Sequence, residues 1–181
     1  LVGPHQIQNA GLGIMALAEL SDKRINRKAV DVGVKDVDWP ARMQQLTQGP
    51  LCSLLPDHWE LWLDGGHNPA AGVAIAATLE KLEDAPNHLI TGMINTKTPS
   101  GFLAPLRKYT KSLTAIKIPN QGASFSSDEI SIVAKKIGFK TKIAGSVGKA
   151  IKEIVATEKS CARILICGSL YLAGDILRDN K

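Results

Sequence analysis

The stretch from residue 61 to residue 71 constrains the fold most, because an apolar run, a glycine pair and an Asn-Pro pair follow one another there. Leu-Trp-Leu at 61–63 is typical of a buried strand, and the glycines at 65–66 can adopt backbone angles closed to other residues. Asn68 is a favourable N-cap, and Pro69 suits the first helical position. The stretch therefore predicts a strand, a tight turn and a helix.

Asp64 ends the predicted strand, so its carboxylate is expected at the edge of the sheet where ligands collect in open α/β folds. The helix that follows has an electropositive N-terminus, which makes this turn a candidate nucleotide site. The alternative is an ordinary strand-to-helix turn, in which Asp64 and Asn68 only accept hydrogen bonds from backbone N–H groups. The residues alone leave both interpretations open.

The string Leu-Asp-Gly-Gly-His-Asn-Pro at 63–69 resembles the Leu-Asp-Gly-Ala-His-Asn-Pro signature of the folylpolyglutamate synthase/dihydrofolate synthase family, relatives of the Mur ligases. The departure is Gly66 in place of alanine. Three further segments follow the family's order, Gly-Pro-His-Gln-Ile-Gln-Asn-Ala at 3–10, Trp-Pro-Ala-Arg at 39–42 and Gly-Ser-Leu-Tyr-Leu at 168–172. Members of the family begin with a P-loop ATPase domain, whereas this sequence contains no G-x-x-x-x-G-K-[ST]. We therefore expect the C-terminal part of such a ligase.

The resemblance implies that four residues contact ATP: Asn9, Arg42, Asp64 and His67. A carboxamide can donate and accept one hydrogen bond each, as the N6/N7 edge of adenine requires, and a guanidinium suits phosphate oxygens. Asp64 is expected at a ribose hydroxyl, because a carboxylate avoids the phosphates.

Each of these residues also has an ordinary interpretation. Asn9 can be a capping or solvated asparagine, and Arg42 a solvated surface residue. His67 can simply pack over the glycine turn. The family has glycine where this chain has Ala41, which leaves the conformation of the loop around Arg42 open.

Two further candidates follow later strands. Lys97 stands where the family usually has a lysine-aspartate pair and could meet a phosphate or a substrate carboxylate, although a solvated loop lysine is the alternative. Ser169 is either a helix N-cap, which we favour, or a substrate contact. No catalytic residue is assigned, and the spacing of His5, His58 and His88 gives no metal site.

Apolar runs and helical stripes alternate from residue 60 onward. They predict strands at 60–64, 88–93, 112–118, 139–143 and 162–168, and helices at 68–83, 100–108, 127–137, 147–157 and 170–178. Right-handed crossovers then give an α/β fold with a doubly wound, mostly parallel sheet. The resemblance implies that this is the Rossmann-like C-terminal domain of the Mur ligases. Ahead of it, residues 43–55 predict a short hairpin that turns at Gly49-Pro50, with 51–55 as the return strand.

The first 40 residues predict two helices, at 5–20 and about 25–37. So short a segment cannot bury enough surface to stand alone, and the resemblance assigns it to the tail of the central ATPase domain. Trp39-Pro40 marks the linker, so we expect domains at 1–40 and 41–181. The two helices should pack on the following domain or expose a face that another part of the protein covers.

Composition narrows the class of protein. No run approaches the roughly 18 apolar residues of a membrane span. The net charge of +5 would help attract anions such as ATP, but the lysines are scattered and 4% aromatic content gives no nucleic-acid pattern. Three cysteines without C-x-x-C spacing indicate reduced thiols in a cytoplasmic protein. Of these, Cys161 and Cys167 are expected in the core.

By resemblance, the parent protein is an ATP-dependent acid–amino-acid ligase that adds L-glutamate to dihydropteroate and/or folates through an acyl phosphate. Its cofactors are ATP and Mg²⁺, with the metal ligands in the N-terminal part, and its own N-terminal ATPase domain is the expected protein partner. The chain alone is expected to be inactive. The alternative is a stand-alone nucleotide-binding or regulatory module without catalysis. A nicotinamide-dependent oxidoreductase is disfavoured, because Gly-Leu-Gly-Ile-Met-Ala at 11–16 follows no predicted strand.

Overall fold

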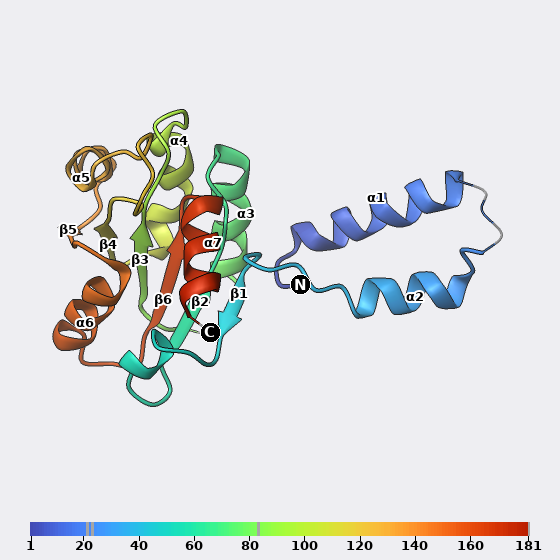
Figure 1. Ribbon diagram of the computed structural model, residues 1–181, viewed down its shortest axis with the longest axis horizontal. Helices are drawn as coiled ribbons and strands as arrows, with labels where there is room; N and C mark the ends of the chain where they lie inside the picture. Colours follow the sequence, from blue (N-terminus) through green and yellow to red (C-terminus); the bar gives the residue numbers. More distant parts are fainter. Residues whose placement is uncertain (21, 23, 83, 181) are drawn as a thin grey trace.

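The computed structural model describes residues 1–20, 22, 24–82 and 84–180, and it shows an α/β domain from whose side a helical hairpin projects (Figure 1). The sheet has six strands in the order β1-β2-β6-β3-β4-β5. Their bounds are Gln44–Leu46 for β1, Glu60–Leu63 for β2, Asn87–Thr91 for β3, Ser112–Ala115 for β4, Thr141–Ile143 for β5 and Arg163–Cys167 for β6. Strands β2 to β6 pair in parallel, and β1 pairs antiparallel with β2 at the edge.

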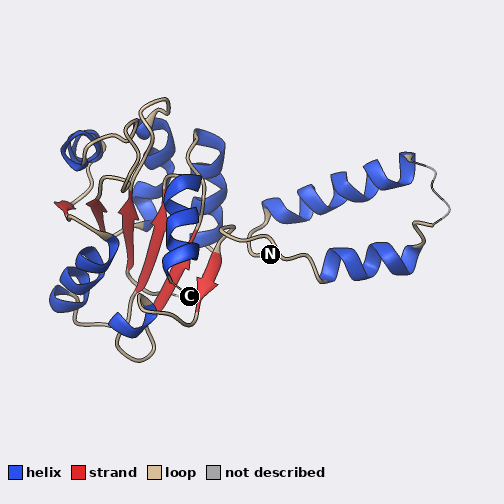
Figure 2. Cartoon of the chain, viewed as in Figure 1, coloured by secondary structure: helices blue, strands red, loops and turns tan. Residues whose placement is uncertain are grey.

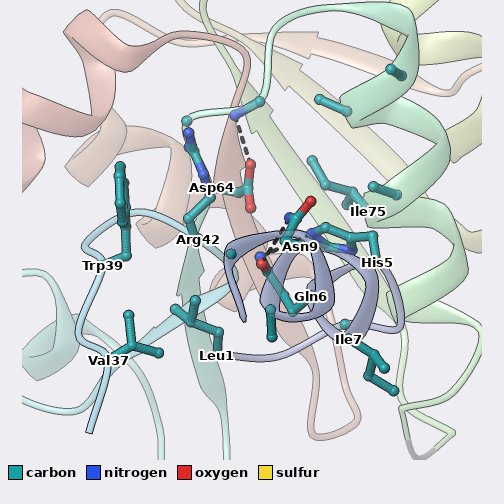
Figure 3. Close-up of a pocket in the computed structure, with 18 of the residues that line it drawn as sticks. Leu1, His5, Gln6, Ile7, Asn9, Val37, Trp39, Arg42, Asp64 and Ile75 are labelled. Atoms are coloured by element: carbon teal, nitrogen blue, oxygen red, sulfur yellow. Dashed lines mark hydrogen bonds between the residues drawn. The ribbon is translucent and has the colours of Figure 1, made fainter. Parts of the chain in front are cut away.

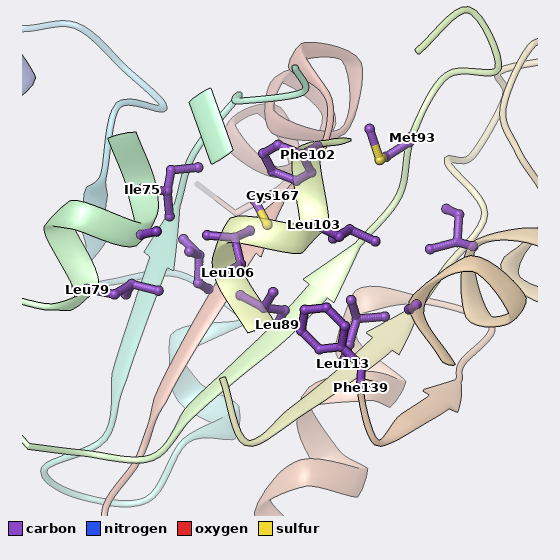
Figure 4. Packing of buried hydrophobic residues seen from close by; sticks show 14 of the residues in the cluster. Ile75, Leu79, Leu89, Met93, Phe102, Leu103, Leu106, Leu113, Phe139 and Cys167 are labelled. Carbon is purple, nitrogen blue, oxygen red and sulfur yellow. The ribbon is translucent and has the colours of Figure 1, made fainter. Parts of the chain in front are cut away.

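Helices cover both faces of this sheet (Figure 2). They are α3 (Pro69–Leu79), α4 (Pro99–Leu103), α5 (Ser127–Lys136), α6 (Val147–Thr157) and α7 (Leu170–Asp179), with 3₁₀ turns η1 (Cys52–Leu54) and η2 (Ala104–Tyr109). Because side chains alternate along a strand, successive residues of β3 enter different cores. Leu89 packs with α3, α4 and α5 (Figure 4), whereas Ile90 packs with α6 and α7. The doubly wound, mostly parallel α/β fold is thereby confirmed.

The predicted hairpin at 43–55 is wrong. Strand β1 pairs with β2, from Gln44 opposite Leu63 to Leu46 opposite Leu61, and the supposed return strand contains η1 instead. The apolar side chains of 51–55 pack against the core on the α6 and α7 side, so their hydrophobicity reflects burial under the sheet. Periodicity in so short an apolar run cannot separate these two outcomes.

Several predicted boundaries also need correction. The predicted helix at 68–83 ends at Leu79, and its last predicted residue, Glu83, lies outside the described residues. The predicted helix at 100–108 changes from α4 to η2 at Ala104, next to Pro105, which has no N–H to donate. The strand predicted at 112–118 ends at Ala115. By contrast, the helix predicted at 147–157 coincides with α6.

The projecting hairpin consists of α1 (His5–Glu19) and α2 (Arg27–Lys35), and neither helix contains a buried residue. Both extend away from the domain (Figure 1). Apolar side chains along α1, such as Ile7, Leu12 and Met15, are largely exposed. The sequence left two outcomes for these helices, packing on the domain or exposing an apolar face. The structure shows the second.

The cysteine expectation holds in part. Cys167 is buried at the end of β6, but Cys161 is exposed. Cys161 precedes β6 in the loop that leads into it, so the sheet does not cover its side chain. None of the described helices has the length and apolar character that a membrane span requires.

Candidate functional site

A pocket of about 1000 Å³ lies between the helical hairpin and the carboxyl end of β2 (Figure 3). The N-terminal turns of α1, the linker that ends at Arg42, the glycine turn and the start of α3 form its walls. The pocket brings together the four residues predicted to contact a nucleotide: Asn9, Arg42, Asp64 and His67. Lys97 and Ser169 are not among the residues that line it.

The carboxylate of Asp64 points toward backbone N–H groups of the protein. Its Oδ2 accepts a hydrogen bond from the Met43 N–H at 2.8 Å, and its Oδ1 accepts one from the Gly66 N–H at 2.6 Å. The side chain is 6% exposed, and burial raises the pKa of its carboxyl group against the opposing effect of these two hydrogen bonds and of Arg42. Asp64 therefore satisfies backbone donors from two separate turns.

Arg42 stands between two residues with left-handed backbone angles. The φ angle is 57° at Ala41 and 42° at Met43. The loop keeps this shape although alanine replaces the family's glycine, because the Ala41 N–H donates to Gln44 Oε1 at 2.9 Å and its carbonyl accepts from the Gly65 N–H at 2.9 Å. Among the described residues, no salt bridge includes Arg42. Its Nη1 donates to the Ala41 carbonyl at 3.3 Å, which leaves the other N–H groups of the guanidinium for an anion in the pocket.

The imidazole of His67 has a defined orientation. Its Nδ1 lies 2.9 Å from the carbonyl oxygen of Gly65. Because a carbonyl can only accept, Nδ1 carries the hydrogen, and the neutral ring presents Nε2 as an acceptor. The start of α3 lies beside it: Asn68 Oδ1 caps the helix by accepting from the Ala71 N–H at 2.9 Å. This wall therefore offers an acceptor next to an electropositive helix N-terminus.

Asn9 lines the pocket from α1, where its helical neighbours hold it. Its Nδ2 donates to Gln6 Oε1 at 3.1 Å, and Gln6 Nε2 lies 3.0 Å from His5 Nε2. The oxygen of the Asn9 amide and one amide hydrogen remain for a ligand. Figure 3 shows Trp39 across the pocket from His5.

Sequence reasoning gave no role to three residues that line the pocket: His5, Gln6 and Trp39. The segments 3–10 and 39–42 contain them and were the available signal. His5 Nδ1 is buried without a hydrogen-bond partner. A Cβ at Gly3, whose φ is +117°, would lie 2.6 Å from His5 Cε1, so the close approach of this ring needs a glycine.

The two remaining candidates lie elsewhere. Ser169 Oγ accepts from the Tyr171 N–H at 3.1 Å, which shows it as the N-cap of α7, and the residue is 3% exposed. Lys97 is exposed in the turn that follows β3. Neither residue lines the pocket.

A metal ion does not fit the donor set that this chain offers. Within the described ranges there is no group of three or more His, Cys, Asp or Glu side chains that could hold one. The one carboxylate among the described residues that line the pocket is Asp64, whose oxygens are already engaged by the backbone.

Comparison with known proteins adds a family and a fold. A family model described as "Dihydrofolate synthetase, C-terminal domain" matches residues 52–179. A probable dihydrofolate synthetase from Schizosaccharomyces pombe is 26% identical over 98% of this chain and 43% of its own length. A dihydrofolate synthase/folylpolyglutamate synthase from Bacillus subtilis is 27% identical over 100% of this chain and 40% of its own length.

A solved structure of similar fold is that of Mycobacterium tuberculosis folylpolyglutamate synthase complexed with ADP and AMPPCP. It superimposes with a TM-score of 0.83 at 21% identity, over 100% of this chain and 41% of that one. The chain thus spans less than half the length of these relatives.

Proposed function

The chain belongs to the dihydrofolate synthetase C-terminal domain family, and from this premise we propose that it is the nucleotide-contacting C-terminal part of an ATP-dependent ligase. The parent enzyme adds L-glutamate to dihydropteroate, to folates or to both. The relatives are named as synthases of these two kinds, and one of them is described in complex with ADP and AMPPCP.

The observation that carries the proposal is the set of groups that face one pocket. Arg42 supplies a cation without a carboxylate partner, and the N-terminus of α3 supplies a second electropositive element, as phosphate oxygens require. Asn9 presents an amide that suits an adenine edge. A volume of about 1000 Å³ is sufficient for a nucleotide.

For the remaining residues, we propose the part of the ligand that each contacts from the hydrogen bonds and contacts it can still make. His67 Nε2 is an acceptor for a ribose hydroxyl, because Nδ1 already donates to Gly65. Trp39 offers an aromatic face to a base. Asp64 supports the site through its hydrogen bonds to the Met43 and Gly66 N–H groups. Lys97 is kept as a candidate for a substrate carboxylate, whereas the capping role of Ser169 leaves its oxygen engaged.

The proposed reaction has two steps. A carboxylate oxygen of the pterin or folate substrate attacks the γ-phosphorus of ATP, which forms an acyl phosphate and releases ADP. The amine of glutamate then attacks the acyl carbon, loses a proton and displaces phosphate as the amide bond forms. The residues of this chain bind and orient the nucleotide, while Mg²⁺ and the phosphate-cradling loop belong to the N-terminal ATPase domain. The chain alone is accordingly proposed to turn over no ATP.

Calorimetry with ADP and ATP tests the proposal. Arg42→Ala is expected to weaken nucleotide binding by about ten- to a hundred-fold, because it removes a charge-assisted contact worth roughly 1.5–3 kcal/mol. Arg24→Ala, at the far end of the hairpin, is the matched control and should bind as the wild type does. Equal affinity of Arg42→Ala and the wild type, or no binding by the wild type, would contradict the proposal.

A further inference from the structure

One carboxylate joins the bend around Arg42 to the glycine turn, two neighbouring walls of the pocket. Asp64 Oδ2 accepts from the N–H of Met43, the residue after the linker, and Oδ1 accepts from the Gly66 N–H in the glycine turn. A backbone hydrogen bond of 2.9 Å from the Gly65 N–H to the Ala41 carbonyl runs beside them. We call the two hydrogen bonds accepted by Asp64 the clamp. Strand β6 holds the backbone of Asp64 in place, because the Asp64 N–H donates to the Ile166 carbonyl at 2.9 Å.

The linker needs such a clamp. Ala41 and Met43, on either side of Arg42, both have positive φ angles. A left-handed conformation is unfavourable for an L-residue, and it persists only where the surroundings hold it. Both residues are almost fully buried, so the bend is fixed at its two ends and Arg42 alone reaches toward the pocket.

We propose that Asp64 is a positioning residue that aims the Arg42 guanidinium at the nucleotide phosphates. It bonds Met43 on one side of Arg42 directly, and it bonds Gly66 in the glycine turn, whose Gly65 N–H holds Ala41 on the other side. The inference rests on the proposed nucleotide function of the pocket and deepens it. Both oxygens of Asp64 are bonded to the backbone and the side chain is 6% exposed, so a direct bond to ribose is not its main task. The ribose acceptor is His67 Nε2.

The geometry also predicts that asparagine does not replace Asp64. An asparagine has one acceptor oxygen, and its NH₂ group would face a backbone N–H at either Met43 or Gly66. One half of the clamp is therefore lost in Asp64→Asn. Ala41→Gly should return part of the loss, because glycine adopts positive φ without strain.

A double-mutant cycle on ADP affinity tests the positioning role. Asp64→Asn is expected to weaken binding at least about tenfold in the wild-type background but less than about threefold in the Arg42→Ala background, because Asp64 acts through Arg42. Ala41→Gly should recover part of the affinity of Asp64→Asn. Equal losses in both backgrounds indicate a direct contact of Asp64 and would overturn the inference.

Amide hydrogen exchange of the nucleotide-free chain supplies the second readout. In Asp64→Asn, exchange at Met43 or Gly66 should accelerate at least about tenfold while the amides of α6 keep their protection. Unchanged exchange at both positions would overturn the clamp. A wild type that binds no ADP overturns the proposed function and with it the nucleotide role of Asp64. Additive losses with wild-type binding intact overturn this inference alone.

Discussion

Asn180 and Leu51 lie 129 positions apart in sequence, and the Oδ1 of Asn180 accepts a hydrogen bond from the Leu51 N–H at 2.7 Å. The Nδ2 of the same side chain donates to the Gln48 carbonyl at 3.0 Å. Gly49 lies between Gln48 and Leu51 in the sequence and has a φ of +101°. A Cβ at Gly49 would collide with the backbone oxygen of Asn180. The end of α7 therefore fixes the loop that follows β1.

Asn180→Ala is expected to lower the free energy of unfolding by roughly 1–2 kcal/mol, because it removes both hydrogen bonds and leaves a partly buried N–H without its acceptor. Urea denaturation measures the change. Asp179→Ala, the neighbouring exposed position, is the control and should cost less than about 0.5 kcal/mol. Equal stability of Asn180→Ala and the wild type would show that the loop holds itself.

This contact explains why one part of the fold escaped prediction. The apolar residues at 51–55 look like a strand, but their partners come from α7 and from the core under the sheet. Helix α6 agrees with its predicted bounds, because its apolar stripe faces one core; the structure shows Ser146 as its N-cap. Local signals therefore located the elements, whereas long-range contacts decided how residues 43–55 fold.

In the candidate site too, local sequence predicted the positions of residues, whereas their contacts depend on the tertiary structure. The sequence placed Asp64 at the end of β2 and Asn68 at the helix cap, and both positions are confirmed. It left open whether Asp64 bonds backbone or ligand. The bond from Gly66 is local, but the bond from Met43 comes from 21 positions away. Segment 3–10 pointed to His5, but the buried Nδ1 of His5 results from the packing of α1 near Gly3, which no local pattern predicts. Nucleotide contact by Asn9, Arg42, Asp64 and His67 stays a prediction.

Glu158 is predicted to make stability depend on pH in acid. Its Oε2 accepts from Lys111 Nζ at 2.6 Å, and its Oε1 accepts from Ser160 Oγ at 2.9 Å. The bond to Lys111 is the main cause that lowers the pKa of Glu158 to about 2. Since the folded pKa is below the unfolded one, this contribution is complete above about pH 4.5 and is lost as the pH falls toward 2.

Glu158→Gln should therefore destabilise the protein by roughly 1–2 kcal/mol at pH 7, with a difference from wild type that shrinks between about pH 4.5 and 2. Denaturation at several pH values measures it. His88 Nε2 lies 3.1 Å from Glu158 Oε2. Burial lowers the pKa of His88 from 6.5, so its part of the acid loss begins near pH 6.5. A difference constant from pH 7 to 2 would contradict the role of Glu158.

The cysteines should differ in reactivity. Cys161 is exposed, whereas Cys167 is buried and burial raises its pKa to about 12. Because the thiolate is the reactive form, a disulfide reagent at pH 8 is expected to modify Cys161 at least about a hundredfold faster than Cys167 in the native protein. Cys161→Ser should abolish the fast phase. Comparable rates for the two thiols would mean that β6 opens readily.

The last prediction concerns the boundary between the hairpin and the domain. Both hydrophobic cores are built from residue 41 onward, and α1 and α2 contain no buried residue. A chain that begins at Trp39 should therefore unfold cooperatively, with a melting temperature within about 4 °C of the full chain's, since this corresponds to roughly 1 kcal/mol. Its urea m-value should also stay nearly the same, because m follows the surface exposed on unfolding and the hairpin buries little of it. The shortened chain should lose ADP binding, since Asn9 and the α1 wall of the pocket are absent. A broad transition or a clearly smaller m-value would show that the hairpin is part of the domain's cooperative unit.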